Sequence, residues 1–593
     1  MKWHLLSDPP KEFLDSFPDL PDIVCKLLWH RDIRTQTKVD EFFNSDYLTD
    51  IHDPFLFQDM NKAVDIIFTA IAKKKNIIVH GDYDADGVCS TAILIKTLKK
   101  LGAIEPQVFI PHREIDGYGL SKKTVKFFID KKIDLVITCD CGITNHDEVV
   151  MAKEAGMKVI ITDHHSVPTT LPPADAIIHT QLPGTNYPHK DLCGAGVAFK
   201  VAQALLKKHQ EKNQTLPDGQ AHIGFEKWLL DLVAIATIGD MVALSGESRA
   251  LVKYGLIVLN KTQNIGLKKL FAVANLYDED GKLKKNINSE TVSFQIVPRL
   301  NAAGRMDHAN TAYALLVEED EEEAEKLAIK LQKNNSKRQS LTEKITAEAI
   351  KQIKKEKQED NPILFAFDKA WSAGLVGLIA GKIKDIYYRP VIIMGKADKE
   401  ITGSGRSIKQ FNIIKALQEM PEFFSKFGGH PQACGFSLKD KKQLKEFKAT
   451  LLEKAHIATT GLELVPEIDI DAEVDLAEVD WKFFDLLQKF APFGQTNEEP
   501  KYLATNLTVA RINPVGQDKK HLQIMVKHNS HTITKTIAFG FGDIKKHPDD
   551  WTNLQVGDKI DLVFKVSVNE WNGNRELQLG VEAIKKSTVI LSS

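Results

Sequence analysis

The stretch Val79–Ser90, VHGDYDADGVCS, places three alternating aspartates, Asp82, Asp84 and Asp86, directly before Gly87. Two kinds of metal site begin in this way. One is the calcium loop of the EF-hand type, which needs a helix on either side and a glutamate at its twelfth position. The other is a catalytic metal cluster at the end of a strand.

The residues on both sides of this stretch exclude the calcium loop. Position twelve, counted from Asp82, is Ile93, whose side chain binds no cation. The residues before the aspartates, Asn76–His80 (NIIVH), are β-branched and apolar, so they indicate a strand and not a helix. We therefore expect the aspartates at the end of a strand.

Similar short strands recur downstream and set the fold class. Asp134–Thr138 (DLVIT) and Lys158–Thr162 (KVIIT) are also β-branched, and helix-like segments at Thr91–Leu101 and Asp147–Ala155 alternate with them. This alternation predicts an α/β fold with a parallel sheet. In such sheets, functional sites collect at the carboxyl ends of the strands.

The composition limits the class of protein. At about 100–200 residues per domain, 593 residues predict three or four domains. A hydrophobic share of 43% and a net charge of −2 predict a folded soluble protein without a globally basic surface. The six scattered cysteines are interpreted as reduced thiols. We see neither an apolar signal segment nor eighteen consecutive apolar residues, so we expect a cytoplasmic protein without membrane spans.

Changes in composition and in the pattern of apolar residues along the sequence predict five parts. These are an N-terminal cap (1–50), a first α/β domain (51–317), a connecting helix (318–360), a second α/β domain (361–457) and a β-rich domain (458–593). The connector is polar and free of Pro and Gly, so we interpret it as a long solvated helix. The second α/β domain has predicted strands at Ile363–Phe367 and Pro390–Met394 and predicted glycine-rich turns at GSGRS (403–407) and FGGHPQACG (427–435).

The C-terminal part predicts a small antiparallel barrel or sandwich, and the oligonucleotide-binding barrel is one candidate. The pair Asn572-Gly573 is typical of a hairpin turn. The expected strands are Leu507–Ile512, His521–Lys527, Thr532–Phe539, Lys559–Val568 and Arg575–Leu579.

Acids and histidines follow four apolar runs, each interpreted as a strand of the first sheet. A lone aspartate after a strand is usually a helix cap or a turn residue. Four clusters at one sheet edge would crowd their carboxylates, and each would resist ionisation unless cations compensate the charge. Carboxylates with imidazoles suit Mn²⁺ or Mg²⁺, and two such ions form a site for phosphoester hydrolysis. The clusters are Asp82-Asp84-Asp86, Asp140, Asp163-His164-His165 and Asp240.

These motifs carry a family resemblance. HGDYDADG (80–87), CDCGI (139–143), TDHH (162–165) and IGDMV (238–242) resemble, in this order, the four motifs of the DHH phosphoesterase superfamily. Most of the chain, from about 50 to 570, resembles the RecJ family of bacterial single-strand-specific 5′→3′ DNA exonucleases. The motifs that carry this second resemblance are PHREIDGYGL (111–120), VPRLNAAGRM (297–306), GSGRS (403–407), FGGHPQACGFS (427–437) and APFGQTNEEP (491–500).

The resemblance implies roles for the motif residues at a site with two Mn²⁺ or Mg²⁺ ions. Asp163 would orient a histidine, and His165 would face the scissile phosphate. His80 stands where smaller relatives carry a ligand, so whether His80 or Asp82 touches metal stays open. Asp84, Asp140 and His165 would be the catalytic residues. The implied ligands are Asp82, Asp84, Asp86, Asp140 (bridging the two ions), His164 and Asp240.

The resemblance also implies a site for the 5′ phosphate of DNA. A terminal phosphate requires arginine forks and small donors, although a single surface arginine is usually just solvated. Gly428 and Gly429 would let the backbone approach phosphate, and His430 could contact substrate. The remaining implied residues are Arg113, Arg305, Ser404 and Arg406.

The resemblance predicts a DHH domain, a DHHA1 domain and a DNA-binding barrel that together release 5′-mononucleotides from single-stranded DNA. It implies roles in DNA repair and recombination, a monomeric state, and partners such as a single-strand-binding protein and a RecQ-type helicase. Two alternatives stay open. One is a DHH phosphodiesterase for short oligonucleotides or cyclic dinucleotides, and the other is a catalytically inactive DNA-binding scaffold.

Overall fold

A five-stranded parallel sheet carries the first motifs, as the sequence predicts. Its strand order is β3-β2-β4-β5-β6, and every neighbouring pair is parallel. The predicted α/β class is confirmed, and the strand at 158–162 has the predicted limits. The strands are β2 (Ile77–His80), β3 (Gln107–Phe109), β4 (Leu135–Cys139), β5 (Lys158–Thr162) and β6 (Ala176–Ile178).

The computed structural model describes residues 1–211, 224–397, 400–516, 519–528, 533–542, 554–571 and 574–587. The chain forms two compact units, one of Asp46–Leu464 and one of Met1–Ser45 with Val465–Ser593. No helix among the described residues has the length and apolar character needed to cross a membrane.

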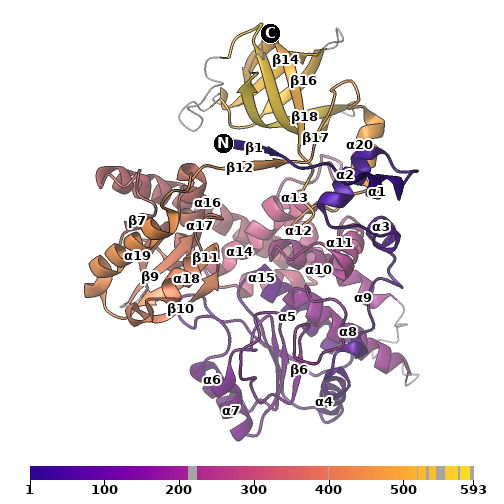
Figure 1. Ribbon diagram of the computed structural model, residues 1–593. Coiled ribbons are helices and arrows are strands. Elements are labelled where there is room, and N and C mark those ends of the chain that lie inside the picture. Colours follow the sequence, from indigo (N-terminus) through magenta and orange to yellow (C-terminus); the bar gives the residue numbers. More distant parts are fainter. Residues whose placement is uncertain are drawn as a thin grey trace. The chain divides into compact units, whose positions relative to one another are not determined.

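Helices cover both faces of the parallel sheet because successive strand residues point to opposite sides. Val79 and Ile137 face a core shared with α4 (Met60–Ala72), α5 (Ala85–Lys100) and α8 (Gly194–Glu211). Ile78 and Val136 face the opposite core, which is closed by α6 (Lys122–Asp130) and α7 (His146–Glu154). Figure 1 shows α6 and α7 on one side of β6 and α4 on the other.

A helical layer follows the sheet and corrects one prediction. Asp240 was expected at a strand end, but it is the C-terminal cap residue of a helix, α10. This helix is apolar on all sides and almost wholly buried, so periodicity alone could not distinguish it from a buried strand. The layer comprises α9 (Phe225–Trp228), α10 (Leu230–Gly239), α11 (Gly246–Leu259), α12 (Ile265–Val273), α13 (Ser289–Thr291), the π-helix η2 (Val292–Ile296), α14 (Val297–Met306) and α15 (Asn310–Val317).

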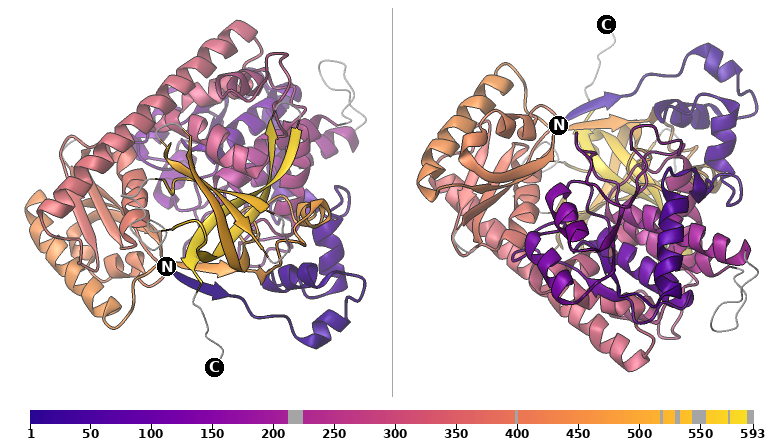
Figure 2. Two further views of the ribbon diagram at one scale, coloured as in Figure 1. Left: turned by 90° about the horizontal axis from the view of Figure 1, so that it is seen from above. Right: turned by 90° about the horizontal axis from the view of Figure 1, so that it is seen from below.

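The predicted connecting helix is α16 (Glu321–Lys355), the long rose-coloured helix in both views of Figure 2. It is more than a solvated connector, because one of its faces is buried. Its first half packs Ala328 and Leu331 into the core of the first sheet, and its second half packs Ala349 and Ile353 into that of the next sheet.

The second α/β part is a five-stranded mixed sheet of order β10-β11-β9-β8-β7, in which only β7 and β8 are parallel. On one face it packs α16 and α17 (Ala373–Tyr387), and on the other α18 (Ile413–Gln418) and α19 (Leu444–Thr459). The strands are β7 (Leu364–Phe367), β8 (Val391–Ala397), β9 (Glu400–Arg406), β10 (Phe424–His430) and β11 (Ala433–Leu438).

One of the two predicted glycine-rich turns of this part is wrong, because residues 403–406 of GSGRS lie within β9. The segment FGGHPQACG does contain a turn, at Pro431 and Gln432, but its glycines lie in the ends of β10 and β11. Gly403 is opposite Phe436, whose ring would be 2.3 Å from a Cβ added at Gly403. The glycine therefore makes room for a cross-strand aromatic ring and does not mark a turn.

The other unit contains the closed five-stranded barrel expected at the C-terminus. Strands β14 (Tyr502–Val515), β15 (His521–Lys527), β16 (Ile533–Ala538), β18 (Asn574–Lys586) and β17 (Lys559–Trp571) follow one another, and β17 closes back on β14. All pairs in this ring are antiparallel except β16 with β18, which are parallel. Asn572 and Gly573 lie outside the described residues, but Trp571 pairs with Asn574 across them.

The N-terminal segment belongs to the barrel unit. β1 (Lys2–Leu5) pairs in parallel with β12 (Glu467–Ile470), and β13 (Ala472–Glu473) pairs with β14. Three N-terminal helices share the barrel's apolar core. The helices of this unit are α1 (Lys11–Asp15), α2 (Asp22–His30), α3 (Gln36–Phe43) and α20 (Trp481–Gln488).

Candidate metal and phosphate site

The loop after β2 positions the first acids by capping α5. Oδ1 of Asp84 accepts hydrogen bonds from the backbone N–H groups of Asp86 (3.0 Å) and Gly87 (3.1 Å). A Cβ at Gly87 would be 2.5 Å from the carbonyl oxygen of Asp82, so the turn tolerates only glycine there. Asn301 on α14 accepts the N–H of Ala85 at 2.7 Å and ties the same turn to the helical layer.

Asp140 follows β4 in a left-handed backbone conformation, with φ of 59°. Its N–H donates to the carbonyl oxygen of Thr162 at 3.0 Å, which aligns the ends of β4 and β5. Gly194 packs directly on it, since a Cβ at Gly194 would be 2.6 Å from that of Asp140. The Asp140 side chain is therefore held at the strand end by both backbone and packing.

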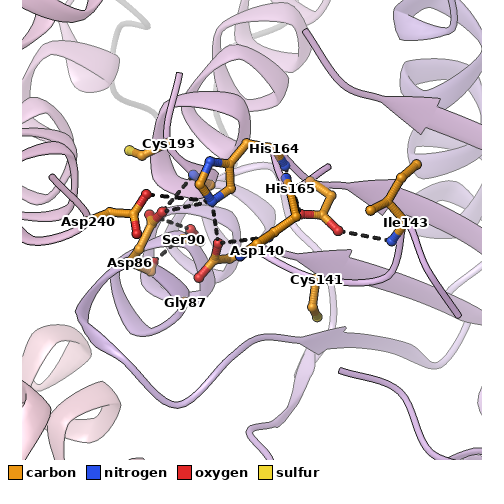
Figure 3. A network of polar contacts seen from close by, with 12 residues as sticks. Asp86, Gly87, Ser90, Asp140, Cys141, Ile143, His164, His165, Cys193 and Asp240 are labelled. Carbon is orange, nitrogen blue, oxygen red and sulfur yellow. Dashed lines mark hydrogen bonds and ion pairs between the residues drawn. The ribbon is translucent and has the colours of Figure 1, made fainter. Parts of the chain in front are cut away.

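The motif side chains converge into three overlapping groups, each with its ligand atoms within 4.8 Å of one another. Asp140 and His164 each belong to two groups. Nε2 of His164 lies 3.1 Å from Oδ1 of Asp140 and 3.7 Å from both Asp86 and Asp240 (Figure 3). The groups are Asp82-Asp84-Asp140, Asp86-His164-Asp240 and Asp140-His164-His165.

Positively charged groups of the protein, among them His165 and Arg113, offset only part of the negative charge of this cluster. Burial and the neighbouring carboxylates raise the pKa of Asp82 and Asp140 well above the ordinary value and that of Asp240 to about 8. Oδ1 of Asp82, Oδ1 of Asp140 and Nε2 of His164 are buried without a hydrogen-bond partner. Buried polar atoms are normally satisfied, so these orphaned atoms fit divalent cations as their missing partners.

Two backbone groups that the sequence analysis did not identify hold Asp86. The N–H groups of Gly194 and Ala195, at the start of α8, each donate to its carboxylate at 2.7 Å. The run Cys193-Gly194-Ala195-Gly196 carried a signal, because small residues at a helix start allow close approach of a ligand or side chain.

Asp163 orients His165, as the resemblance implies for it. Its Oδ1 accepts from Nδ1 of His165 at 2.8 Å, and its Oδ2 accepts the N–H of Ile143 at 2.9 Å. Burial acts to raise the pKa of Asp163, but the hydrogen bond and charge of His165 outweigh it and lower the pKa to about 2. Burial likewise acts to lower the pKa of His165, but Asp163 raises it to about 9.

Tyr118 is a second contact of His165 that the sequence analysis did not single out. Its hydroxyl lies 3.0 Å from Nδ1 of His165 and 3.1 Å from the carbonyl oxygen of Asp140. The motif PHREIDGYGL contained it, but a tyrosine in a glycine-flanked loop has no pattern that assigns a role.

His80 lies apart from the candidate metal groups. It is fully buried on β2, its Nδ1 lies 3.2 Å from the carbonyl oxygen of Phe109, and burial lowers its pKa to about 4. None of the groups found among the described residues includes it, whereas one includes Asp82. The geometry thus favours Asp82 over His80 as the ligand beside Asp84.

All three expected phosphate-binding arginines, Arg113, Arg305 and Arg406, lie near the acids of the cluster or near one another. Nη1 of Arg305 donates to the carbonyl oxygen of Gly374 at 2.9 Å, and Nη1 of Arg406 to the hydroxyl of Ser404 at 3.1 Å. Arg113 stacks on the ring of Tyr83 at 3.9 Å, and its Nε has no hydrogen-bond partner in the part of the chain that the structure describes. Burial and the charges of Arg113 and Arg406 lower the pKa of Arg305 to about 9, although Asp84 opposes them.

Glu114 joins the two α/β parts at the start of α17. Its Oε1 accepts from the hydroxyl of Ser372 at 2.7 Å and from the N–H of Gly374 at 3.3 Å. The loop that carries Arg113 is thereby tied to α17, and the carbonyl oxygen of Gly374 on α17 also accepts from Arg305. The contact spans 258 residues of sequence, so no local pattern indicated it.

Gly428, Gly429 and His430 form the exposed end of β10. Gly429 needs to be glycine, because its φ is 147° and a Cβ would be 2.2 Å from the carbonyl oxygen of Ala433. Within the described part of the chain, no side-chain hydrogen bond or ion pair joins His430 to the arginines or the metal groups. The substrate-binding role of these three residues stays a prediction.

Comparison with known families divides the chain into three matched regions. Residues 76–237 match the N-terminal domain of the DHH family, residues 360–456 the DHHA1 domain and residues 470–583 the RecJ OB domain.

Curated relatives match nearly the whole chain. The Single-stranded-DNA-specific exonuclease RecJ of Bacillus subtilis is 34% identical over 98% of this chain and 70% of its own length. The protein of the same name from Escherichia coli is 33% identical over 88% of this chain and 90% of its own length.

Solved structures show the same architecture with metal bound. RecJ from Thermus thermophilus in complex with Mn²⁺ has a TM-score of 0.80 and 28% identity, and covers 99% of this chain and 80% of its own. The corresponding complex with Mg²⁺ has a TM-score of 0.74 and 25% identity, with 99% and 79% covered.

Proposed function

Because the chain belongs to the RecJ family, we propose that it is a metal-dependent exonuclease that degrades single-stranded DNA from the 5′ end. We further infer that it uses two Mn²⁺ or Mg²⁺ ions and releases 5′-mononucleotides. The observation that carries the proposal is the partly buried group of carboxylates and imidazoles with orphaned atoms, next to arginines that form no ion pair with an acid among the described residues.

The residues around the cluster divide into two sets for two ions. Asp82, Asp84 and Asp140 would hold one, and Asp86, His164 and Asp240 the other, with Asp140 close enough to His164 to serve both. Bound divalent cations would lower the pKa of water and offset the negative charge on the attacking and leaving oxygens.

The protein itself supplies orientation and positive charge. Asp163 keeps the proton on Nδ1 of His165, so Nε2 of the same ring can donate to a phosphate oxygen. In the metal-free protein, Asp163 raises the pKa of His165 to about 9 against the effect of burial, so the ring is a good hydrogen-bond donor. His165 is thus suited to stabilise charge on the scissile phosphate.

Arg113, Arg305, Ser404 and Arg406 would bind the terminal 5′ phosphate and thereby select the end from which digestion starts. Guanidinium groups suit this task because their planar forks bind phosphate oxygens in pairs. The glycine at 377 leaves room for this, since a Cβ there would be 3.2 Å from Nη2 of Arg406.

The barrel would bind single-stranded DNA, as expected for an oligonucleotide-binding fold. Action in DNA repair and recombination, a cytoplasmic location, a monomeric state and partners such as a single-strand-binding protein or RecQ-type helicase are further parts of the proposal. They follow from the family alone.

The two alternatives have less support. A phosphodiesterase for short oligonucleotides or cyclic dinucleotides has no need of the C-terminal barrel. An inactive scaffold would not retain a complete set of motif acids, whose burial in one cluster costs stability without metal.

The test is digestion of a single strand labelled at either end, with Mn²⁺, Mg²⁺ or EDTA. We expect 5′-labelled mononucleotides first, no cleavage in EDTA and no cleavage of duplex. Cleavage in EDTA would contradict metal dependence, and early release of the 3′ label would contradict the polarity.

A further inference from the structure

The inner face of α16 carries polar side chains between its two apolar halves. Leu331 packs into the first core and Ile345 into the next, while Asn335 and Arg338 occupy the same face between them. Asn335 is almost fully buried. This polar section follows Gln332, whose Oε1 accepts from Nε of Arg299 at 2.8 Å. Arg299 lies on α14, the helix that also carries Arg305.

Among the described residues, three polar atoms of this section have no hydrogen-bond partner. They are Nδ2 of Asn334, Oδ1 of Asn335 and Nε of Arg338. An unsatisfied buried polar atom destabilises the fold, and a buried charge without a counter-charge destabilises it more. Such a group within a protein core suggests a ligand that supplies the missing contacts.

The charge around Arg338 indicates the sign of that ligand. No ion pair joins Arg113, Arg305, Arg338 or Arg406 to an acidic side chain anywhere in the described ranges. Burial is the largest cause that lowers the pKa of Arg305, and the charge of Arg113 is the next. The charges of Arg338 and Arg406 lower this pKa further. Cations that repel one another in this way would be stabilised by a shared anion.

A terminal phosphate fits this group better than an internal one. A phosphate monoester carries close to two negative charges at neutral pH, whereas a diester within the DNA strand carries one. Arg338 is only half buried, so its terminal nitrogens can reach a ligand although its Nε is enclosed. Arg338 lies outside every sequence motif that suggested a phosphate contact.

We propose that Arg338 on α16 binds the 5′-terminal phosphate of single-stranded DNA together with Arg305. This inference rests on the function proposed above and adds a residue from the connecting helix to the phosphate site. It also gives α16 a role in substrate selection beyond joining the two sheets.

The test measures binding without turnover. Affinities of the full-length protein for 3′-fluorescein-labelled oligonucleotides with a 5′-phosphate or a 5′-hydroxyl are compared by anisotropy in EDTA. For Arg338→Ala, we expect the preference for the phosphorylated end to fall about tenfold, the size of a lost hydrogen bond to a charged group. Arg338→Lys should keep part of the preference, because it retains the charge but not the fork.

Lys337→Ala is the matched control, because its side chain is exposed on the same helix and should leave the preference unchanged. Thermal unfolding checks that each variant is folded, and Arg338→Lys still decides the question if the alanine variant is not. An unchanged preference, or an equal loss with both oligonucleotides, overturns the role of Arg338. If the wild type itself shows no preference, the proposed recognition of the 5′ phosphate fails, and the role of Arg338 fails with it.

Discussion

Asp163 and His165 form a hydrogen-bonded pair in which Oδ1 of Asp163 accepts from Nδ1 of His165 at 2.8 Å. Asp163 is completely buried, while His165 faces the candidate metal groups. Asp163 directly follows β5, so its hydrogen bond fixes the His165 side chain relative to that strand. The same contact lowers the pKa of Asp163 and raises the pKa of His165.

Replacing Asp163 with asparagine should lower the stability of the metal-free protein most between about pH 4 and 6.5. The folded pKa of Asp163, about 2, lies below the unfolded value of about 3.9, so this contribution is present above pH 4 and is lost as pH falls. The folded pKa of His165, about 9, lies above the unfolded value of about 6.5, so its contribution is lost as pH rises.

Denaturant unfolding of the wild type and Asp163→Asn in EDTA at pH 5.5 and 9.5 measures this difference. Asp147→Asn, on the exposed surface of α7, is the control. A difference that does not depend on pH would contradict the assigned pKa shifts.

Asp140→Asn should abolish cleavage without loss of folding. Loss of a residue that hydrogen-bonds to a metal ligand typically lowers metal affinity or activity about 10–100-fold. Asp140 belongs to two of the candidate ligand groups, so its loss should lower activity by more than about 100-fold. Because burial and neighbouring acids raise the pKa of Asp140, the neutral amide should be at least as stable as the wild type in EDTA.

Digestion assays and thermal unfolding with and without Mn²⁺ check this prediction. Mn²⁺ should raise the unfolding temperature of the wild type and have little effect on Asp140→Asn. Full activity of the variant would rule out Asp140 as a ligand.

Gly194→Ala should weaken metal binding although glycine carries no ligand. The added Cβ would be 2.6 Å from that of Asp140, and the backbone N–H of Gly194 also holds Asp86. We expect Mn²⁺ affinity, measured by calorimetry, to fall by at least about tenfold.

Gly196→Ala, in the same helix, is the control. Its Cβ would meet only Leu192, at 3.3 Å. Equal affinities for the two variants would indicate that packing on Asp140 has no influence on the metal site.

Arg406→Ala should raise KM for a 5′-phosphorylated strand about tenfold and affect a 5′-hydroxyl strand much less. The reason is the position of its guanidinium beside the Ser404 hydroxyl and Arg305. Steady-state digestion of both strands provides the measurement. Arg389→Ala, whose guanidinium donates to the carbonyl oxygen of Leu464, should leave the ratio of the two KM values unchanged.

Asp471→Asn should destabilise the unit of Met1–Ser45 and Val465–Ser593 by about 3 kcal/mol. Its carboxylate lies 3.6 Å from both Arg31 and His30, all three side chains being largely buried. Burial acts to raise the pKa of Asp471, but the neighbouring His30 and the charge of Arg31 lower it. The contribution is therefore present above the unfolded pKa of about 3.9 and is lost as pH falls.

Denaturant unfolding at pH 6 and pH 3 compares Asp471→Asn with the wild type. Asp469→Asn breaks only the exposed pair with His4 and should change stability by less than about 1 kcal/mol at either pH. A difference of the same size for Asp471→Asn at both pH values would exclude the ionised pair as its source.

Local patterns were sufficient for many parts of the fold and of the candidate site. Alternation and β-branching located β4, β5 and β15 to within a residue, because these strands are short and bounded by polar residues. Since parallel strands end at one edge of the sheet, the acids after β2, β4 and β5 could be expected to meet. The grouping of Asp82, Asp84, Asp140 and His164 agrees with that expectation.

Local patterns failed where burial or a distant partner determines conformation. The run that ends at Asp240 is apolar on all sides, so its helix had no periodic signal. The glycines of GSGRS suggested a turn. In the folded chain, Gly403 is needed because the ring of Phe436, on the neighbouring strand, occupies the space of a side chain there.

The sequence by itself determined the fold class and the chemistry of the candidate site, because strand periodicity and the types of charged side chain are local properties. Only the tertiary structure decided which distant groups hold the site residues: Gly194 and Ala195 at Asp86 and Gly374 at Arg305. It also paired β1 with β12, across 465 residues. Partners so far apart in sequence are selected by packing and hydrogen bonding in the folded chain, and no short stretch encodes them.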